Sequence, residues 1–276
     1  MTTATNYKLP ITNYSERQTL NPRNVKPLVY LILGAAGSGR REVVADLIEG
    51  GLADGAKPAV LLAADEPASE LDPKLPGLAR WTWTGEAIEA ALPPDATHLF
   101  FVTQGRVNPV EQIDVFKPWL EAQGGELARV ISVVNCQLAE KNPPLLAWYE
   151  ACVHFSDIVL LNRREGVANK WLSDFLAYFQ DKFYPCLFEQ VKAGRVKNPA
   201  LVLEPQARRL SHWFDEEQDW VFTNADGEEI DEEEVTEDDE EIEATPVEDL
   251  YLARDAAGRR AKRIPDIGKF LGGLEP

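Results

Sequence analysis

Five short, continuous apolar runs constrain the fold of this chain more than any other feature. They lie at residues 28–33, 59–63, 99–102, 130–134 and 158–161. A strand buried on one face alternates apolar and polar residues, whereas a strand covered on both faces of a parallel sheet reads as a continuous apolar run. Helical patterns separate several of these runs, and strands that alternate with helices are joined by right-handed crossovers. The sequence therefore predicts an α/β fold with a doubly wound, mostly parallel sheet.

The helices between the runs are predicted from apolar spacing and capping residues. The clearest follows Asn108, a favoured N-cap, with Pro109 at the first helical position, Glu111 in the place of a capping-box acid and an apolar stripe beyond. A helix after the first run is expected to end at the glycine pair 50–51. Further helices are expected over residues 144–155, 168–179 and 201–214.

The charge of the chain is concentrated near its C-terminus. The formal net charge is −18, but residues 215–249 hold 19 of the 46 acidic residues and none of the 28 basic ones, which leaves the rest of the chain near neutral. Like charges at this density repel one another and bury little apolar surface, so we expect a disordered acidic segment. We divide the chain into an N-terminal extension, an α/β domain, this acidic segment and a basic C-terminal tail (1–27, 28–214, 215–249 and 250–276).

Composition excludes several classes of function. No apolar run reaches the roughly 18 residues of a membrane-spanning helix, and residues 1–27 lack the apolar core of a secretory signal. The three cysteines, Cys136, Cys152 and Cys186, are too widely spaced for a disulfide framework or paired metal ligands, so we expect a reducing cytoplasm. The sequence shows no broad basic face of the kind that binds nucleic acid.

The acidic segment has three possible roles. It solubilises the chain, folds back on the basic residues at 254–269, or docks on a basic partner.

A glycine-rich loop, G-A-A-G-S-G-R-R, joins the first apolar run to the first helix. A strand, such a loop and a helix form the context of a phosphate-binding loop. Glycines let backbone N–H groups turn toward an anion, and the helix N-terminus points at the same place. We expect a phosphate cradle that includes Gly34, Gly37, Ser38 and Gly39. A tight strand-to-helix turn with no ligand stays the alternative.

The last two residues of the loop depart from the GxxxxGK[ST] pattern. Arg40 stands where a lysine reaches the β- and γ-phosphates, and it keeps the charge with a longer, planar head. Arg41 stands where a Ser or Thr hydroxyl binds Mg²⁺, and a guanidinium has no lone pair for a metal. Because phosphoryl transfer relies on that metal, the loop is suited to holding an anion and poorly suited to hydrolysis.

Residues 28–190 resemble the CobW/HypB/UreG class of P-loop GTPases, and the CobW-type proteins in particular. Residues 102–110, V-T-Q-G-R-V-N-P-V, are similar to the family's E-T-T/S-G-L-A-x-P stretch, with Thr103, Gly105 and Pro109 in agreement. The resemblance makes Gly105 the switch II glycine. Val102 stands where the family has its Walker B glutamate, so that acid is missing. The resemblance implies a P-loop NTPase-like fold and GTP as the ligand.

The stretch D-I-V-L-L-N-R-R-E at 157–165 resembles the family's guanine-recognition motif, A-D-x-x-x-x-N-K-x-D. The resemblance implies nucleotide contacts for Asn162, which matches, for Arg163 in place of the lysine, and for Glu165 in place of the aspartate. A glutamate is one methylene longer, so bidentate contact with guanine requires a shift of the backbone or the base. Preference for guanine is therefore weakened.

The family's C-x-C-C metal site has no counterpart, since residues 78–85 contain no cysteine and indole and threonine do not replace thiolates. We interpret Asp65 and Glu66 as an exposed acidic turn and not as metal ligands. Four substitutions stand at the family's lysine, metal-binding hydroxyl, acid and base-reading aspartate, namely Arg40, Arg41, Val102 and Glu165. Together they indicate a pseudo-GTPase without catalytic or metal-binding residues, which binds a nucleotide weakly or without Mg²⁺ and acts through a protein partner. A slow GTPase with a relocated metal ligand, and an adaptor or scaffold with an empty loop, stay as alternatives.

Overall fold

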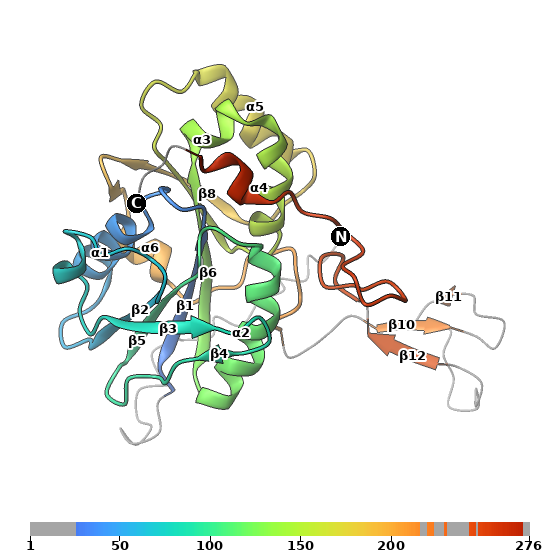
Figure 1. Cartoon of the computed structure of the whole chain (residues 1–276), viewed down its shortest axis with the longest axis horizontal. Coiled ribbons are helices and arrows are strands. Elements are labelled where there is room, and N and C mark those ends of the chain that lie inside the picture. Colours follow the sequence, from blue (N-terminus) through green and yellow to red (C-terminus); the bar gives the residue numbers. More distant parts are fainter. Residues whose placement is uncertain (1–25, 216–219, 224–228, 231–242, 247, 273–276) are drawn as a thin grey trace, which may run out of the picture.

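The computed structural model describes residues 26–215, 220–223, 229–230, 243–246 and 248–272. The N-terminal extension apart from residues 26–27, and most of the acidic segment, lie outside these ranges. The described part forms a nine-stranded sheet covered by helices on both faces, and a separate three-stranded sheet (Figure 1). Its strands are β1 (Leu28–Gly34), β2 (Pro58–Ala63), β3 (Ala79–Trp83), β4 (Ile88–Glu89), β5 (His98–Val102), β6 (Glu126–Asn135), β7 (Ile158–Asn162), β8 (Leu187–Lys192), β9 (Arg195–Val196), β10 (Trp220–Thr223), β11 (Glu229–Ile230) and β12 (Glu243–Pro246).

The large sheet has the order β4-β3-β2-β5-β1-β6-β7-β8-β9. The strands from β3 to β8 in this order are parallel, and the short edge strands β4 and β9 are antiparallel to their neighbours. The five apolar runs form β2, β5, β1, β6 and β7, at the centre of the sheet. With the glycine loop between β1 and the next helix, this arrangement is a P-loop NTPase-like α/β fold, and the predicted fold class is confirmed.

The helices are α1 (Arg40–Gly51), α2 (Pro109–Gln123), α3 (Cys136–Lys141), α4 (Leu146–His154), α5 (Asn169–Gln180) and α6 (Pro199–Leu203), with short 3-10 turns η2 (Asp72–Lys74), η3 (Pro143–Leu145) and η5 (Ile267–Phe270). The Asn108 side chain accepts a hydrogen bond from the Val110 amide, so the predicted N-cap of α2 is confirmed. The helix expected over 201–214 is wrong. α6 ends at Leu203, because the residue before Pro205 is forced out of the helical region.

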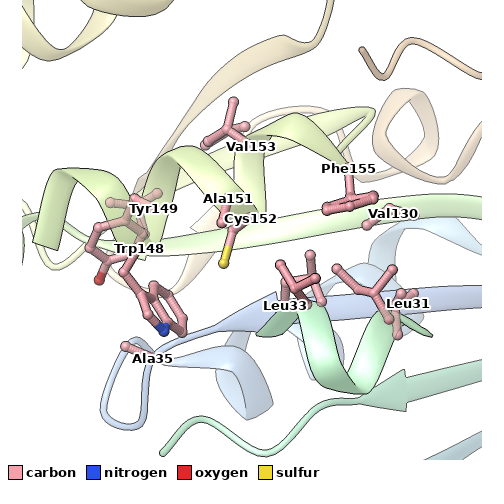
Figure 2. Packing of buried hydrophobic residues seen from close by; sticks show 14 of the residues in the cluster. Leu31, Leu33, Ala35, Val130, Trp148, Tyr149, Ala151, Cys152, Val153 and Phe155 are labelled. Carbon is pink, nitrogen blue, oxygen red and sulfur yellow. The ribbon is translucent and has the colours of Figure 1, made fainter. Parts of the chain in front are cut away.

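The core lies on both faces of the sheet, as the continuous runs predicted. Alternate residues of β1 point to opposite sides, with Leu31 and Leu33 on one face and Tyr30 and Ile32 on the other, and all are buried. Figure 2 shows α4 lying over the first face, with Cys152 and other buried side chains directed toward β1. α1 and α6 cover the second face.

The glycine pair 50–51 has a different role from the one expected. α1 does end there, but its C-cap is Leu52 in an extended conformation, and neither glycine is left-handed. A Cβ atom on Gly51 would lie 2.8 Å from the Leu203 side chain and 2.9 Å from the Pro199 carbonyl oxygen. The pair therefore permits the close approach of α1 to α6.

The C-terminal segment, which the sequence analysis sets apart as a basic tail, lies against the domain. Tyr251, Leu252, Ile267 and Leu271 are buried in the same core as α2 and α4. Two of its arginines, Arg254 and Arg260, form ion pairs with Glu111 and Asp114 of α2. The sequence did not predict this packing, because the four apolar side chains are spread over some twenty residues that also carry the basic ones.

Within the described part of the chain, no helix combines the length and the hydrophobicity that crossing a bilayer requires.

Candidate functional site

The glycine loop lies at the carboxyl ends of the central parallel strands, where ligands bind in open α/β sheets. Gly37 and Gly39 have φ of 75° and 84°, in the left-handed region that glycine adopts without strain. A Cβ atom on Gly39 would lie 2.4 Å from the Asn162 amide nitrogen, and one on Gly34 would lie 2.5 Å from the Val133 carbonyl oxygen. The loop therefore is folded as a compact turn that only glycine allows.

Hydrogen bonds from three strand ends hold the loop in place. The Ala36 amide donates to the Gly105 carbonyl oxygen at 2.8 Å, beyond β5. The side-chain amide of Asn135, at the end of β6, donates to the Gly37 carbonyl oxygen at 3.2 Å. The side-chain amide of Asn162, at the end of β7, donates to the Ser38 carbonyl oxygen at 2.8 Å. The two asparagine bonds use the carbonyl groups of Gly37 and Ser38, whereas the bond to Gly105 uses the N–H group of Ala36. The N–H groups of Gly37 and Gly39 make no hydrogen bond with the described residues.

A cleft of about 360 Å³ opens over the loop. Its walls are the loop with the first turn of α1, the segment after β2, and residues at the ends of β5 and β7, namely Ala36, Gly37, Gly39, Arg40, Arg41, Glu42, Leu62, Glu66, Pro67, Ala68, Ser69, Leu71, Val102, Arg106 and Arg163. Ser38 does not line it: its hydroxyl is fully buried beneath the loop, and a Cβ atom on Gly34 would lie 3.0 Å from it.

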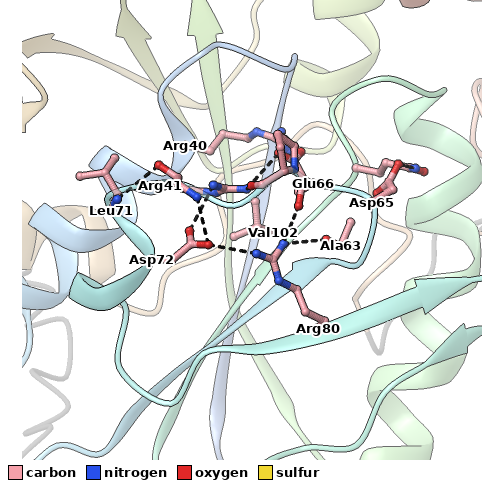
Figure 3. Close-up of polar contacts among 12 residues, drawn as sticks. Arg40, Arg41, Ala63, Asp65, Glu66, Leu71, Asp72, Arg80 and Val102 are labelled. Carbon is pink, nitrogen blue, oxygen red and sulfur yellow. Dashed lines mark hydrogen bonds and ion pairs between the residues drawn. The ribbon is translucent and has the colours of Figure 1, made fainter. Parts of the chain in front are cut away.

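Arg40 lines the cleft, and its guanidinium is held by partners within the chain (Figure 3). Its side chain is 5% exposed. One guanidinium nitrogen, Nη1, donates to the Thr103 carbonyl oxygen, and the other, Nη2, donates to the Glu66 carboxylate. Nη2 also lies against Gly105, because a Cβ atom there would be 2.5 Å away. The charge that stands in the place of the P-loop lysine is thus neutralised within the chain.

Arg41 continues this network away from the loop. Its guanidinium donates to the Pro67 carbonyl oxygen at 2.6 Å, and pairs with the carboxylates of Asp72 at 3.1 Å and Glu66 at 3.5 Å. Arg80 of β3 pairs with the other Asp72 oxygen at 3.0 Å. Positive and negative groups therefore alternate from the loop to β3, and they tie the segment after β2, which forms one wall of the cleft, to the loop (Figure 3).

The interpretation of residues 65–66 as an exposed acidic turn was wrong for one of the two. Asp65 is exposed and accepts a hydrogen bond from Gln104. The Glu66 side chain is only 16% exposed, because both loop arginines cover its carboxylate. Its position directly beyond a buried strand, at the ligand-binding edge of the sheet, was the available sequence signal.

The residues at the metal position do not fit Mg²⁺. Arg41 presents a paired guanidinium where the metal would need a hydroxyl oxygen, and Val102, buried at the end of β5, offers no carboxylate. In the described part of the chain, no group of three histidine, cysteine, aspartate or glutamate side chains is arranged to hold a metal ion.

The residues of the guanine-recognition stretch lie close to the loop. Asn162 is buried, and its amide is bound to the loop carbonyl described above. Arg163 donates to both carboxylate oxygens of Glu42 at 2.8 Å. Glu165 lines a second cavity of about 360 Å³ together with Asn162 and Arg163. Arg163 and Glu42 line both cavities, so their ion pair lies between the cleft over the loop and the second cavity.

One cation at the cleft has no partner among the described residues. Arg106, in the turn after β5, is exposed and makes no ion pair or hydrogen bond with the residues that the structure describes. Neither Arg106 nor the side-chain amide of Asn135 was predicted from the sequence to belong to the site. Arg106 directly follows Gly105, the glycine that agrees with the family stretch at residues 102–110, and this position could have indicated that it lies at the site.

No protein-family model matches the chain, and no curated protein matches it. Among solved structures, the chain is similar to the Zn(II)-bound YjiA GTPase from E. coli, at 14% identity and a TM-score of 0.38, and to a Zn(II)-bound triple mutant of YjiA GTPase, at 16% identity and a TM-score of 0.40. Each likeness covers 73% of this chain and 72% of the other. At these values the likeness carries no conclusion about the site, which stands on its own contacts.

Proposed function

We propose that this protein is a degenerate CobW-type P-loop protein, a pseudo-GTPase that binds a nucleotide through backbone amides without Mg²⁺ and acts through a protein partner. The observation that carries the proposal is the open cleft over the loop, with the amides of Gly37 and Gly39 unpaired among the described residues. Such amides, at the N-terminus of a twelve-residue helix, bind phosphate oxygens.

We infer the absence of turnover from the side chains around that cradle. Hydrolysis in this class requires a metal held by a hydroxyl and an acid, and a lysine on the terminal phosphates. Here Arg41 and Val102 occupy the metal positions, and Arg40 is bound to Glu66 and to the Thr103 carbonyl oxygen. Three groups that hydrolysis needs are thus missing or engaged, while the amides that binding needs are kept.

The nucleoside is proposed to lie toward the second cavity, beside Asn162, Arg163 and Glu165. Because the Arg163–Glu42 ion pair stands between the two cavities, a nucleotide that spans them has to pass over it. A base read here is held without the aspartate of the family motif, so we expect weak discrimination between GDP and ADP. We also expect the protein in the cytoplasm, an expectation that rests on its three widely separated cysteines.

One specific observation favours a second candidate, a scaffold with an empty loop. The Arg40 guanidinium already has two internal acceptors and does not need an anion. The two candidates differ in whether any nucleotide binds.

Binding and phosphate release, measured on the full chain, test the proposal. We expect saturable binding of a fluorescent GDP analogue and no release of phosphate from GTP above the buffer rate. Gly39→Ala, which puts a methyl group at φ 84° beside Asn162, is expected to abolish binding. Gly55→Ala is the matched control, since Gly55 has φ 85° and open space around it. Turnover that Arg40→Ala abolishes would favour a slow GTPase, and no binding at all would favour the scaffold.

A further inference from the structure

The cleft is divided into a free part and an occupied part. The amides of Gly37 and Gly39, which are free of partners in the described chain, belong to the backbone that cradles the α- and β-phosphates in a phosphate-binding loop. The residue at the position of Arg40 reaches the β- and γ-phosphates instead. Here that residue is directed to an internal carboxylate, so a ligand meets an open cradle at one end and an ion pair at the other.

The carboxylate that occupies this end has the chemistry of a phosphate oxygen. Glu66 presents one oxygen to Arg40 and the other to Arg41, as a phosphoryl group bridging two guanidinium groups would. It is also poorly exposed, and it belongs to a segment tied by Arg41 and Arg80 to Asp72. A ligand that takes Arg40 therefore has to displace Glu66 and loosen the segment after β2.

We propose that the Glu66 carboxylate is an internal competitor for the terminal phosphate of the ligand, so that the cleft binds a nucleoside diphosphate in preference to a triphosphate. This inference rests on the proposed nucleotide binding and specifies its ligand. A diphosphate fills the amide cradle and leaves the Arg40–Glu66 pair intact. A third phosphate brings negative charge next to the Glu66 carboxylate, and like charges that lie close together repel.

Glu66→Gln tests this directly, because the amide keeps the shape and loses the charge. Fluorescent GDP and GTP analogues are titrated in EDTA against the wild type and the variant. The affinity for the GTP analogue is expected to rise at least tenfold, while that for the GDP analogue changes much less. Glu70→Gln is the matched control: Glu70 lies in the same segment, is exposed, and makes no hydrogen bond or ion pair with the described residues, so both affinities should stay at the wild-type values.

Two further measurements guard against a variant that folds poorly. Glu66→Asp keeps the charge on a shorter stem and should give a smaller gain for the GTP analogue. In the wild type, saturating GTP in EDTA should speed amide hydrogen exchange in residues 64–72, whereas GDP should not. Equal affinities of wild type and Glu66→Gln for the GTP analogue, with binding intact, would overturn the inference and leave the proposed function standing. No binding by either protein would overturn both.

Discussion

The guanidinium of Arg40 and the carboxylate of Glu66 form an ion pair across the cleft over the glycine loop, between residues 26 positions apart in the sequence. Arg40 opens α1, and Glu66 follows β2, so the pair joins the loop to the segment after β2 that forms one wall of the cleft. The group that would contact phosphate in a P-loop of ordinary composition is thereby satisfied from within.

Breaking one side of this pair should destabilise the fold more than removing both. Glu66→Gln leaves a guanidinium that is 5% exposed without its charged partner, which should lower the free energy of unfolding by about 3 kcal/mol. Arg40→Met in the same background should cost much less, giving a coupling energy of about 1–3 kcal/mol. Urea unfolding of the four proteins measures this cycle. Additive effects would show that the two side chains do not interact.

Asn162 is expected to support the loop and not to select the base. Its amide donates to the Ser38 carbonyl oxygen, and Asn162→Asp replaces this donor by a carboxylate that repels the carbonyl. The free energy of unfolding should fall by about 1–3 kcal/mol, and the affinities for GDP and ADP should fall by the same factor. Titration with both nucleotides measures the ratio. Loss of GDP affinity alone would assign Asn162 to base recognition.

Arg260 should fasten the C-terminal segment to α2. Its side chain is 10% exposed, and the guanidinium donates to both Glu111 oxygens, to Asp114 and to the Leu252 carbonyl oxygen. Arg260→Ala is expected to lower the free energy of unfolding by about 1–2 kcal/mol. Arg259→Ala is the control, because that side chain is 72% exposed and solvent screens its ion pair to Asp255. Equal losses would remove the fastening role.

Asp249 should stabilise the fold only above acidic pH. Burial alone would raise the pKa of this carboxyl, but hydrogen bonds from His154, Ser211 and the Tyr251 amide outweigh it and hold the pKa below its ordinary value. A lowered folded-state pKa gives stability that is complete above the unfolded value of about 3.9 and is lost as the pH falls through the folded value.

Asp249→Asn should therefore cost about 1–3 kcal/mol at pH 7 and markedly less near pH 3. Unfolding curves at the two pH values measure the difference. Asp174→Asn, in an exposed pair with Lys170, is the control and should stay within about 0.5 kcal/mol at both. A cost for Asp249→Asn that is the same at both pH values would contradict the assignment.

The centre of the fold was predictable from the sequence, and its margins were not. The runs that form β1, β2, β5, β6 and β7 are apolar throughout because both faces of these strands are covered. β3 and β8 lie toward the sheet edges and are only partly buried. They therefore contain polar residues and do not form the continuous apolar runs that predicted the central strands. Pro205 ended α6 where apolar spacing alone suggested a longer helix.

The glycine positions of the candidate site were equally predictable, because a left-handed φ or a close backbone approach requires glycine, and the glycines are visible in the sequence. Its electrostatics were not predictable in this way. That Glu66 would neutralise Arg40, or that Arg163 would pair with Glu42, depends on how distant segments approach one another. Substitution of the loop lysine and serine was visible, but the partners that engage the new arginines were visible only in the structure.

Equilibrium titration of the wild-type chain with a fluorescent GDP analogue, once in EDTA and once in excess Mg²⁺, tests the central claim most directly. If backbone amides alone hold the phosphates, the two titrations should saturate with the same dissociation constant. Saturation in Mg²⁺ but not in EDTA, or a failure to saturate in both, would contradict a metal-free phosphate cradle at Gly37 and Gly39.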